Sequence, residues 1–207
     1  MAVVVRILLA LVGLVVSAQV ARRLARHAPF DVATSREAVP VQSALFAPDR
    51  LIRRLPLEPG MRVLLLGPAP DSLMTRVARG VGKYGKVYVL QPSPESARRL
   101  DADLRERHLA NVDALVGQAS HLNVPDATFD LVLAVGQLAG LPRRQRALWE
   151  IERILRPGGH LSVSQALLGP TFLRGETLRR EAGAVGLAWR EQHGLPFAYT
   201  ANFRKPA

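Results

Sequence analysis

Polar residues directly follow several apolar runs of the chain, and these residues are the first candidates for chemistry. Gln91 follows the run Val87–Leu90, Gln118 comes shortly after Asn111–Val116, and His121 lies in the same loop as Gln118. A glutamine amide offers one acceptor oxygen and one donor group. By its location in the loop after the third apolar run, His121 is the best-placed candidate for a general base. For each of these residues the alternative is a solvated position at a strand end or in a loop.

The elements that would position these residues alternate in type from Met61 onward. Short runs rich in Leu and Val predict strands over 62–66, 87–90, 111–116, 129–135, 160–165, 188–193 and 197–204. The stretches between them predict helices over 72–81, 94–108, 143–155 and 171–183. This alternation requires crossover connections, and therefore an α/β fold with a doubly wound, mostly parallel sheet covered on both faces. Such sheets bind ligands at the carboxyl ends of their strands, here near residues 67–71, 91, 118 and 135–138.

Side chains at the helix ends and surfaces give further predictions. Asp71 and Ser93 each precede a predicted helix, where a side-chain oxygen can cap the first free amides. Pro157-Gly158-Gly159 is expected to end the helix at 143–155 and to begin the next strand. Two pairs of opposite charge lie four residues apart in that helix and are expected on its exposed side: Arg146/Glu150 and Glu152/Arg156.

Several common catalytic and metal-binding patterns are absent from the sequence. It contains no Gly-x-Ser-x-Gly, no phosphate-binding loop and no Gly-x-Gly-x-x-Gly, which disfavours a nicotinamide-dependent oxidoreductase. There are no cysteines, so disulfides and thiolate metal sites are excluded. His108, His160 and His193 have no acidic partner at metal-ligand spacing, and no metal is predicted.

The net charge of +11 comes mainly from arginine, with 25 Arg against 3 Lys. These arginines are spread along the chain and often stand beside Asp or Glu, whereas a nucleic-acid footprint would be clustered and interleaved with aromatic residues. Aromatic residues make up only 5% of the chain. The composition therefore favours a solvated surface near anionic lipid headgroups over nucleic-acid binding.

The first segment has the composition of a membrane element. Residues 2–20 are apolar apart from Arg6, Ser17 and Gln19, and as a helix they would rise ~28 Å, close to the hydrocarbon thickness of a bilayer. We expect an N-terminal anchor at 1–21, a basic connector at 22–59 and a single α/β domain at 60–207. Positive residues after the apolar run favour a single-pass membrane protein with its domain in the cytoplasm. The alternative is a cleaved signal peptide, with export of the domain.

The stretch from Pro59 to Gln165 resembles the class I S-adenosylmethionine-dependent methyltransferases that act on small molecules. Four motifs carry the resemblance in order: Pro59–Leu64 leading into Gly67, Gly85–Tyr88 with Ser93–Glu95, Pro125–Val132, and Leu155–Leu161. The resemblance implies a Rossmann-like seven-stranded sheet that closes with an antiparallel strand pair. It also implies S-adenosylmethionine as the cofactor. The cofactor-binding positions implied are Gly67, Ala69, Asp71, Gln91, Pro92, Gln118, Ala119 and Val135.

The sequence departs from the family pattern where the cofactor would bind. The carboxylate usual before the glycine turn is replaced by Leu65 or Leu66, and the turn at 67–71 keeps one glycine. Gln91 and Gln118 stand where the family has acids that face the ribose and the adenine. Since charged hydrogen bonds contribute roughly 1.5–3 kcal/mol against ~1 for neutral ones, each lost charge could weaken binding about tenfold. Asp71 either caps its helix or replaces the missing carboxylate opposite the ammonium group.

Two functions follow from these patterns. The first is methyl transfer to a small or lipid-like acceptor at the membrane face, with His121 and Tyr199 as weak candidates for catalysis. Tyr199 either lines the site or packs in the last strand. The second function is a methyltransferase-like module without activity, tethered to the membrane for binding or interaction.

Overall fold

The computed structural model describes residues 52–67, 69–166 and 171–207. The anchor predicted at 1–21 and most of the connector predicted at 22–59 lie outside these residues. In the described part of the chain, no helix is both long enough and apolar enough to cross a membrane.

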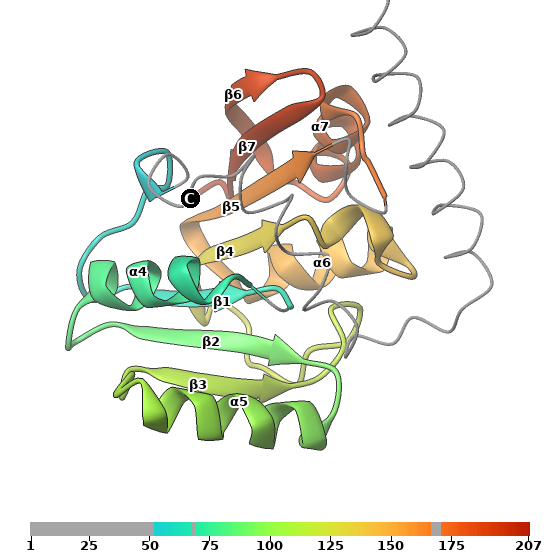
Figure 1. Ribbon diagram of the computed structural model, residues 1–207. Coiled ribbons are helices and arrows are strands. Elements are labelled where there is room, and N and C mark those ends of the chain that lie inside the picture. The colour runs from blue at the N-terminus through green and yellow to red at the C-terminus, as the bar shows by residue number, and fades with distance from the viewer. Residues whose placement is uncertain (1–51, 68, 167–170) are drawn as a thin grey trace, which may run out of the picture.

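A seven-stranded sheet forms the centre of the described structure, in the order β3-β2-β1-β4-β5-β7-β6 (Figure 1). Its strands are β1 (Arg62–Leu65), β2 (Lys86–Gln91), β3 (Val112–Val116), β4 (Phe129–Val135), β5 (Leu155–Ala166), β6 (Ala188–Leu195) and β7 (Ala198–Arg204). The first five strands pair in parallel, and β7 runs antiparallel between β5 and β6. The predicted α/β fold, with its terminal antiparallel pair, is confirmed.

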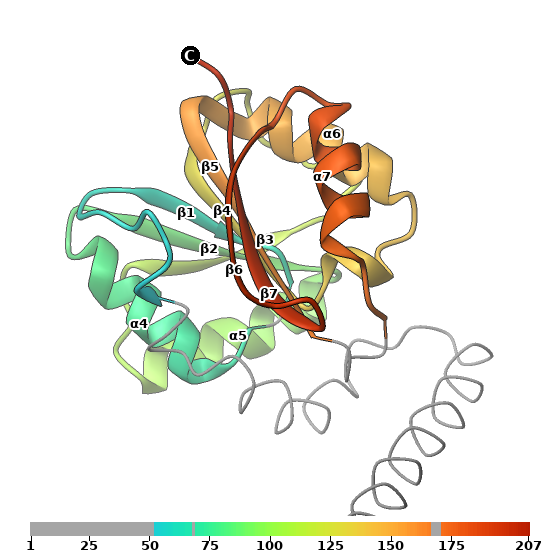
Figure 2. The ribbon, with the colours of Figure 1, turned by 90° about the horizontal axis from the view of Figure 1, so that it is seen from above.

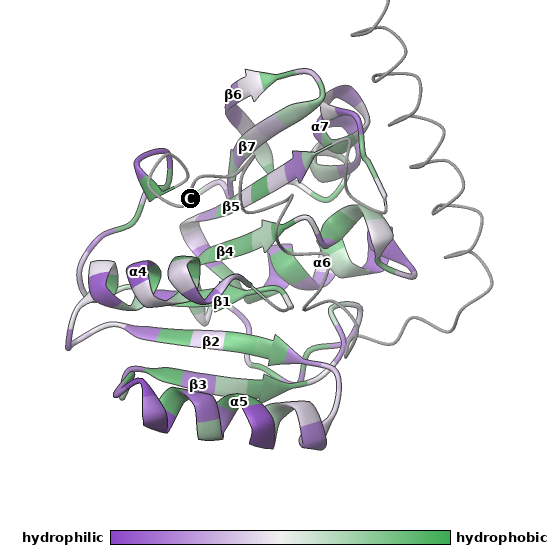
Figure 3. Ribbon diagram, viewed as in Figure 1, coloured by the Kyte–Doolittle hydropathy of each residue, from purple (hydrophilic) through white to green (hydrophobic). Residues whose placement is uncertain are grey.

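Helices cover the sheet on both faces, as Figure 2 shows. They are α4 (Asp71–Val81), α5 (Pro94–Glu106), α6 (Arg144–Ile154) and α7 (Gly175–Gly183), with a short 3-10 turn η2 (Leu138–Gly140) before α6. Successive strand residues point to opposite faces. Val63 and Leu65 pack toward α4 and α5, whereas Leu64 and Leu66 pack toward α6 and α7. Figure 3 shows the resulting contrast between the hydrophobic central strands and the hydrophilic surface of α5.

The start of β5 differs from the sequence prediction. The chain becomes extended at Leu155, immediately after α6, and Leu155 pairs with Phe129. The next pair in register is Leu131 with His160, so the Pro-Gly-Gly stretch is an irregularity inside β5 rather than a turn before it. Gly158 takes φ +78° there, a conformation that glycine adopts without a Cβ penalty.

One of the two predicted helix caps is confirmed and the other is wrong. Ser93 is the N-cap of α5, and its side chain accepts a hydrogen bond from the Ser96 amide. Asp71 does not cap α4, because Pro70 occupies the N-cap position and Asp71 is already the first helical residue. The carboxylate of Asp71 instead receives a hydrogen bond from Arg107, with 2.6 Å between Oδ2 and Nη2.

The connection between β3 and β4 is a loop, residues 117–128, and it is held against α6 by a buried acid. Glu150 is 5% exposed, and its Oε2 accepts from the Leu122 amide at 3.0 Å and from Arg153 at 2.9 Å. The prediction of an exposed Arg146/Glu150 pair is therefore wrong about exposure, although Arg146 does lie 3.4 Å from the carboxylate. The predicted Glu152/Arg156 pair does not form; these two side chains pair instead with Lys205 and Asp130.

Candidate active site

The carboxyl end of β1 turns sharply at Gly67. The Leu66 amide is bound to the Leu133 carbonyl, and Gly67 then takes φ +95°, a region that other residues rarely adopt. A Cβ at Gly67 would also lie 3.3 Å from Cγ of Gln137, which follows β4. The conformation therefore favours glycine here, and a Cβ would also crowd the Gln137 side chain. The turn opens at the edge where a doubly wound sheet binds its ligands.

Three glutamines stand at this edge, one after each of three strands. Gln91 ends β2 and is 8% exposed, and its carbonyl accepts from the Gly117 amide at 2.9 Å. Gln118 is exposed just beyond β3, and Gln137 is half-buried just beyond β4. In the described part of the chain, no side chain or backbone group hydrogen-bonds the three side-chain amides. The edge thus offers neutral donors and acceptors that are free to bind a ligand.

The sequence did not single out Gln137, because the segment after β4 contains no acid, histidine or aromatic residue that would mark a catalytic position. The feature of the sequence that could have indicated Gln137 is its position just beyond the last apolar residue of β4, directly after Gly136. In the structure Gly136 takes φ +70°. A polar side chain placed there reaches back over Gly67.

The acid nearest to this edge in sequence is already paired. Asp71 and Arg107 are linked across α4 and α5, and both side chains are partly exposed. An acid near a helix N-terminus is also favoured by the helix dipole. Of the two predicted roles for Asp71, capping is excluded by Pro70, and pairing with a ligand ammonium would require displacing Arg107.

The other predicted cofactor positions divide between the core and the surface. Ala119 is 7% exposed within the core on the α6 side, and Val135 and Ala69 pack against the core on the α4 side. Pro92 is exposed just after Gln91. The structure therefore brings Gly67, Gln91, Gln118 and Pro92 to one edge of the sheet, at strand ends or in loops. Ala69, Ala119 and Val135 pack in or against the core.

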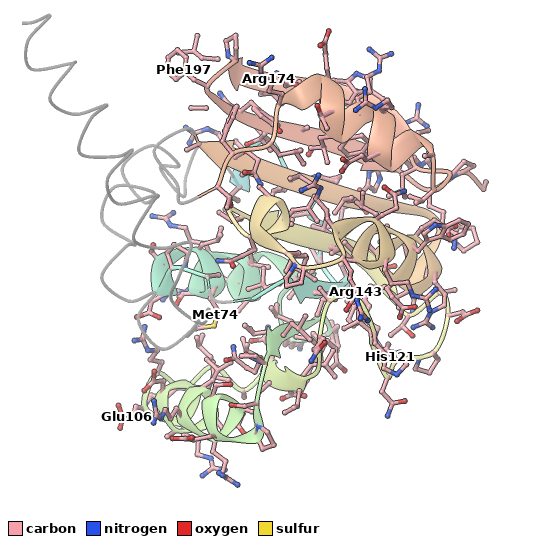
Figure 4. All side chains as sticks on the ribbon, turned by 90° about the vertical axis from the view of Figure 1, so that its right-hand side faces the viewer. Met74, Glu106, His121, Arg143, Arg174 and Phe197 are labelled. Carbon is pink, nitrogen blue, oxygen red and sulfur yellow. The ribbon has the colours of Figure 1, made fainter. Side chains whose placement is uncertain are left out.

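The two candidate catalytic residues occupy different environments. Tyr199 is 1% exposed, its hydroxyl donates to the Leu173 carbonyl at 2.6 Å, and burial raises the pKa of the phenol. Tyr199 therefore packs in the last strand, which is one of the two roles predicted for it. His121 is exposed in the loop after β3, where its amide bonds the Gln118 carbonyl. Figure 4 shows His121 at the periphery of the molecule.

Comparison with known proteins agrees with this geometry. Residues 66–163 match the family model described as a methyltransferase domain. This stretch, which is just under half of the chain, is similar to a methyltransferase domain. S-adenosylmethionine is the cofactor of this family. In the described residues, no cluster of three or more His, Asp or Glu could hold a metal ion.

Similar proteins include enzymes of quinone biosynthesis. A ubiquinone/menaquinone biosynthesis C-methyltransferase of Hydrogenovibrio crunogenus is 39% identical over 109 residues, which are 52% of this chain and 42% of the relative. A demethylmenaquinone methyltransferase of a Geobacillus species is 31% identical over 120 residues, 56% of this chain and 51% of the relative. The chain thus spans about half the length of the curated relatives it matches.

Solved structures share the fold. A SAM-dependent methyltransferase from Aquifex aeolicus superposes with a TM-score of 0.75 over 86% of this chain and 100% of its own, at 19% identity. At that identity the likeness supports the fold alone. The match of residues 66–163 to the family model and the shared fold therefore agree, and the chemistry depends on the residues at the carboxyl edge.

Those residues fit the neutral part of the cofactor better than its charged part. The free amides of Gln91 and Gln118 can bond the hydroxyls and the ring nitrogens of a nucleoside, and the turn at Gly67 presents backbone without a side chain. The ammonium group of the cofactor would meet the Asp71 carboxylate only if Arg107 moved. The site is thus suited to hold a nucleoside by hydrogen bonds without charge.

Proposed function

We propose that this protein transfers a methyl group from S-adenosylmethionine to a small or lipid-like acceptor. The observation that carries the proposal is the free, nearly buried amide of Gln91 beside the Gly67 turn of a methyltransferase domain. The curated relatives named as quinone-biosynthesis methyltransferases support an acceptor of quinone type, which is a ring attached to an apolar chain.

The residues of this chain would act mainly by positioning. The cofactor supplies a methyl group already activated on a sulfonium, so correct alignment of the acceptor provides much of the acceleration. Gln91 would hold the ribose and Gln118 the adenine, while Gln137 would pack over Gly67 at the methionyl end. A base is required only where the acceptor must lose a proton, and His121 is the titratable loop residue at this edge proposed for that step.

We place the domain at the cytoplasmic face of a membrane. The apolar run at residues 2–20, the arginines that follow it and the net charge of +11 support this placement. Carbonate extraction of membranes that contain the full chain tests it, since an anchored protein stays in the pellet. The intact mass of the purified protein distinguishes an anchor from a cleaved signal peptide, because cleavage would remove about twenty residues.

Calorimetric titration of the full chain in detergent with S-adenosylmethionine and S-adenosylhomocysteine tests the cofactor site. We expect binding in the micromolar range, and about tenfold weaker binding after Gln91→Ala, because the amide and its hydrogen bonds are lost. Gln145→Ala is the matched control, since Gln145 is exposed on α6. Equal affinities for the two variants would refute the assignment of Gln91.

A second function is favoured by one specific observation. The Asp71 carboxylate is occupied by Arg107, and the described carboxyl edge has no other acid to pair with the cofactor ammonium. A domain that had lost the cofactor would serve as a tethered binding or interaction module. Absence of heat at millimolar concentrations of both nucleosides would support this second function and end the catalytic proposal.

A further inference from the structure

The sheet has a hollow on the face opposite α4 and α5, far from the carboxyl edge. Because residues 117–128 form a loop and no helix, β2 and β3 have no helix on this face in the described structure. The hollow encloses about 360 Å³, within the range of ~300–1,000 Å³ typical of small-molecule sites. Its principal lining residues are Arg62, Tyr88, Leu115, Val124, Phe129 and Arg156.

The walls of the hollow are largely apolar and fixed in place. The rings of Tyr88 and Phe129 meet edge to face, with 5.5 Å between centroids and 79° between planes. Phe129 is 1% exposed, and Leu115 and Val124 pack against the same core. Glu150 holds the overlying loop through the Leu122 amide. A flat or slender apolar group could therefore lie against these rings with little rearrangement.

Arg62 lines this hollow and has no counter-ion among the residues that the structure describes. The guanidinium of Arg62 lies 5.7 Å from the centre of the Tyr88 ring, and its Nη2 is 3.4 Å from the Tyr88 hydroxyl. Its Nε is buried and has no hydrogen-bond partner. Within the described residues no carboxylate pairs with this guanidinium. A buried donor without a partner is uncommon and is satisfied when a ligand or water binds it.

The other charges around the hollow balance one another. Arg156 pairs with Asp130 at 2.8 Å, and Asp130 also accepts from the Arg62 backbone amide. The neighbouring Asp113 pairs with Lys86 at 2.9 Å. Among the described residues, the hollow is left with the single unpaired positive charge of Arg62, which favours a ligand with one negative charge.

This hollow is separate from the proposed cofactor site. Arg62 and Phe129 are the first residues of β1 and β4, whereas Gly67 and Gln137 follow the carboxyl ends of the same strands. At ~3.3 Å per residue, Arg62 and Gly67 are roughly 16 Å apart along the strand. A ligand in one place would not overlap a ligand in the other.

We propose that this hollow binds a small amphipathic monoanion, an aryl or short acyl carboxylate. The carboxylate accepts hydrogen bonds from the Arg62 guanidinium, and the apolar body packs against Tyr88, Phe129 and Leu115. The charged hydrogen bond to the half-buried guanidinium and the burial of the apolar body both contribute to the affinity. Neither inorganic phosphate, which lacks the apolar body, nor a neutral amide, which lacks the charge, satisfies both parts.

The probe is 4-fluorophenylacetate, followed by fluorine NMR line broadening with the full chain in lipid nanodiscs. Empty nanodiscs correct for partition of the probe into lipid. We expect saturable binding of the acid, at least tenfold weaker binding of 4-fluorophenylacetamide, and no displacement by inorganic phosphate at equal concentration. Saturating S-adenosylhomocysteine is expected to leave the acid bound, which separates this site from the cofactor site.

Two variants test the charge and the space independently. Arg62→Met keeps the side-chain length without the charge and is expected to weaken binding of the acid about tenfold. Leu115→Trp fills the hollow and is expected to abolish binding without a change of charge. Arg99→Met is the matched control, because this exposed arginine pairs with Glu95 on α5.

The affinities of the two variants and of the wild type decide whether the hollow binds the acid as proposed. Circular dichroism of each variant confirms that it is folded before its affinity is compared. Binding of the acid that is unchanged in both Arg62→Met and Leu115→Trp would overturn the proposal. Absence of binding at millimolar acid, or displacement by S-adenosylhomocysteine, would overturn it equally.

Discussion

Removal of the Glu150 carboxylate is expected to destabilise the whole domain. This carboxylate is buried between α6 and the loop at 117–128, where it receives hydrogen bonds from the Leu122 amide and from Arg153. Glu150→Ala leaves a buried amide without a partner, which costs about 1–3 kcal/mol. It also breaks a buried ion pair, and the loss of one partner of such a pair costs about 3–5 kcal/mol in total. Arg153 keeps Asp126 and two loop carbonyls, so we expect a loss of about 3–4 kcal/mol.

Urea unfolding of the full chain in detergent, followed by circular dichroism, measures this loss. For a protein of this size the same loss lowers Tm by about 6–16 °C. Glu150→Gln keeps an acceptor for the Leu122 amide and is expected to lose about half as much. Glu95→Gln, which removes an exposed pair on α5, is the control and is expected to change stability by less than about 0.5 kcal/mol.

The pH dependence of stability provides an independent check. Burial raises the pKa of Glu150, but hydrogen bonds from Arg153 and Leu122 and the nearby positive charges outweigh it, and the pKa is lowered overall. A lowered pKa in the folded state stabilises the protein above the unfolded value of about 4.3, and this stabilisation is lost as pH falls through the lower folded value. The wild type should therefore lose more stability than Glu150→Gln on acidification below pH 5. Equal stability of Glu150→Ala and the Glu95→Gln control at pH 7 would refute the role given to Glu150.

Three further substitutions give distinct outcomes in the same unfolding assay. Gly67→Ala forces a side chain into φ +95°, and we expect the free energy of unfolding to fall by about 1–3 kcal/mol and nucleoside binding to be lost. Unchanged affinity for S-adenosylhomocysteine would contradict the placement of the cofactor. Tyr199→Phe removes the bond to the buried Leu173 carbonyl and should lose about 1–2 kcal/mol without a change in the pH profile of methyl transfer, whereas a changed profile would give the phenol a catalytic role. Glu181→Gln weakens a two-bond pair with Arg144, at 2.7 and 2.9 Å, and should lose about 1–2 kcal/mol; no loss would mean that this partly exposed pair is screened by solvent.

The alternation of apolar runs was sufficient to predict the sheet and its helices. β4 begins at Phe129 and ends at Val135 as expected, because seven residues rich in Leu, Val and Ala can be buried on both faces. The prediction failed at Leu155, where local Pro and Gly residues indicated a turn. Pairing of Leu155 with Phe129 in β4 overrides that local signal, and a distant strand partner is not visible in a short window of sequence.

The places of the candidate residues in the fold were predicted more fully than their contacts. The strand ends at Gly67, Gln91 and Gln118 follow from topology alone, since parallel strands end at a common edge. The partner of Asp71 does not, because Arg107 lies 36 residues away at the far end of α5. The burial of Glu150 was missed for a similar reason: its spacing from Arg146 suits an exposed pair, and only the fold places a loop amide above it.

The place of β7 in the sheet has a consequence for how the protein is made. Residues 198–204 are the last strand in sequence but lie inside the sheet, between β5 and β6. During synthesis from the amino terminus, β5 has no neighbour on that side until these residues emerge from the ribosome. An unpaired strand edge readily joins another chain. Premature termination before Ala198 would therefore leave β5 with a bare edge, and the product would be prone to aggregate.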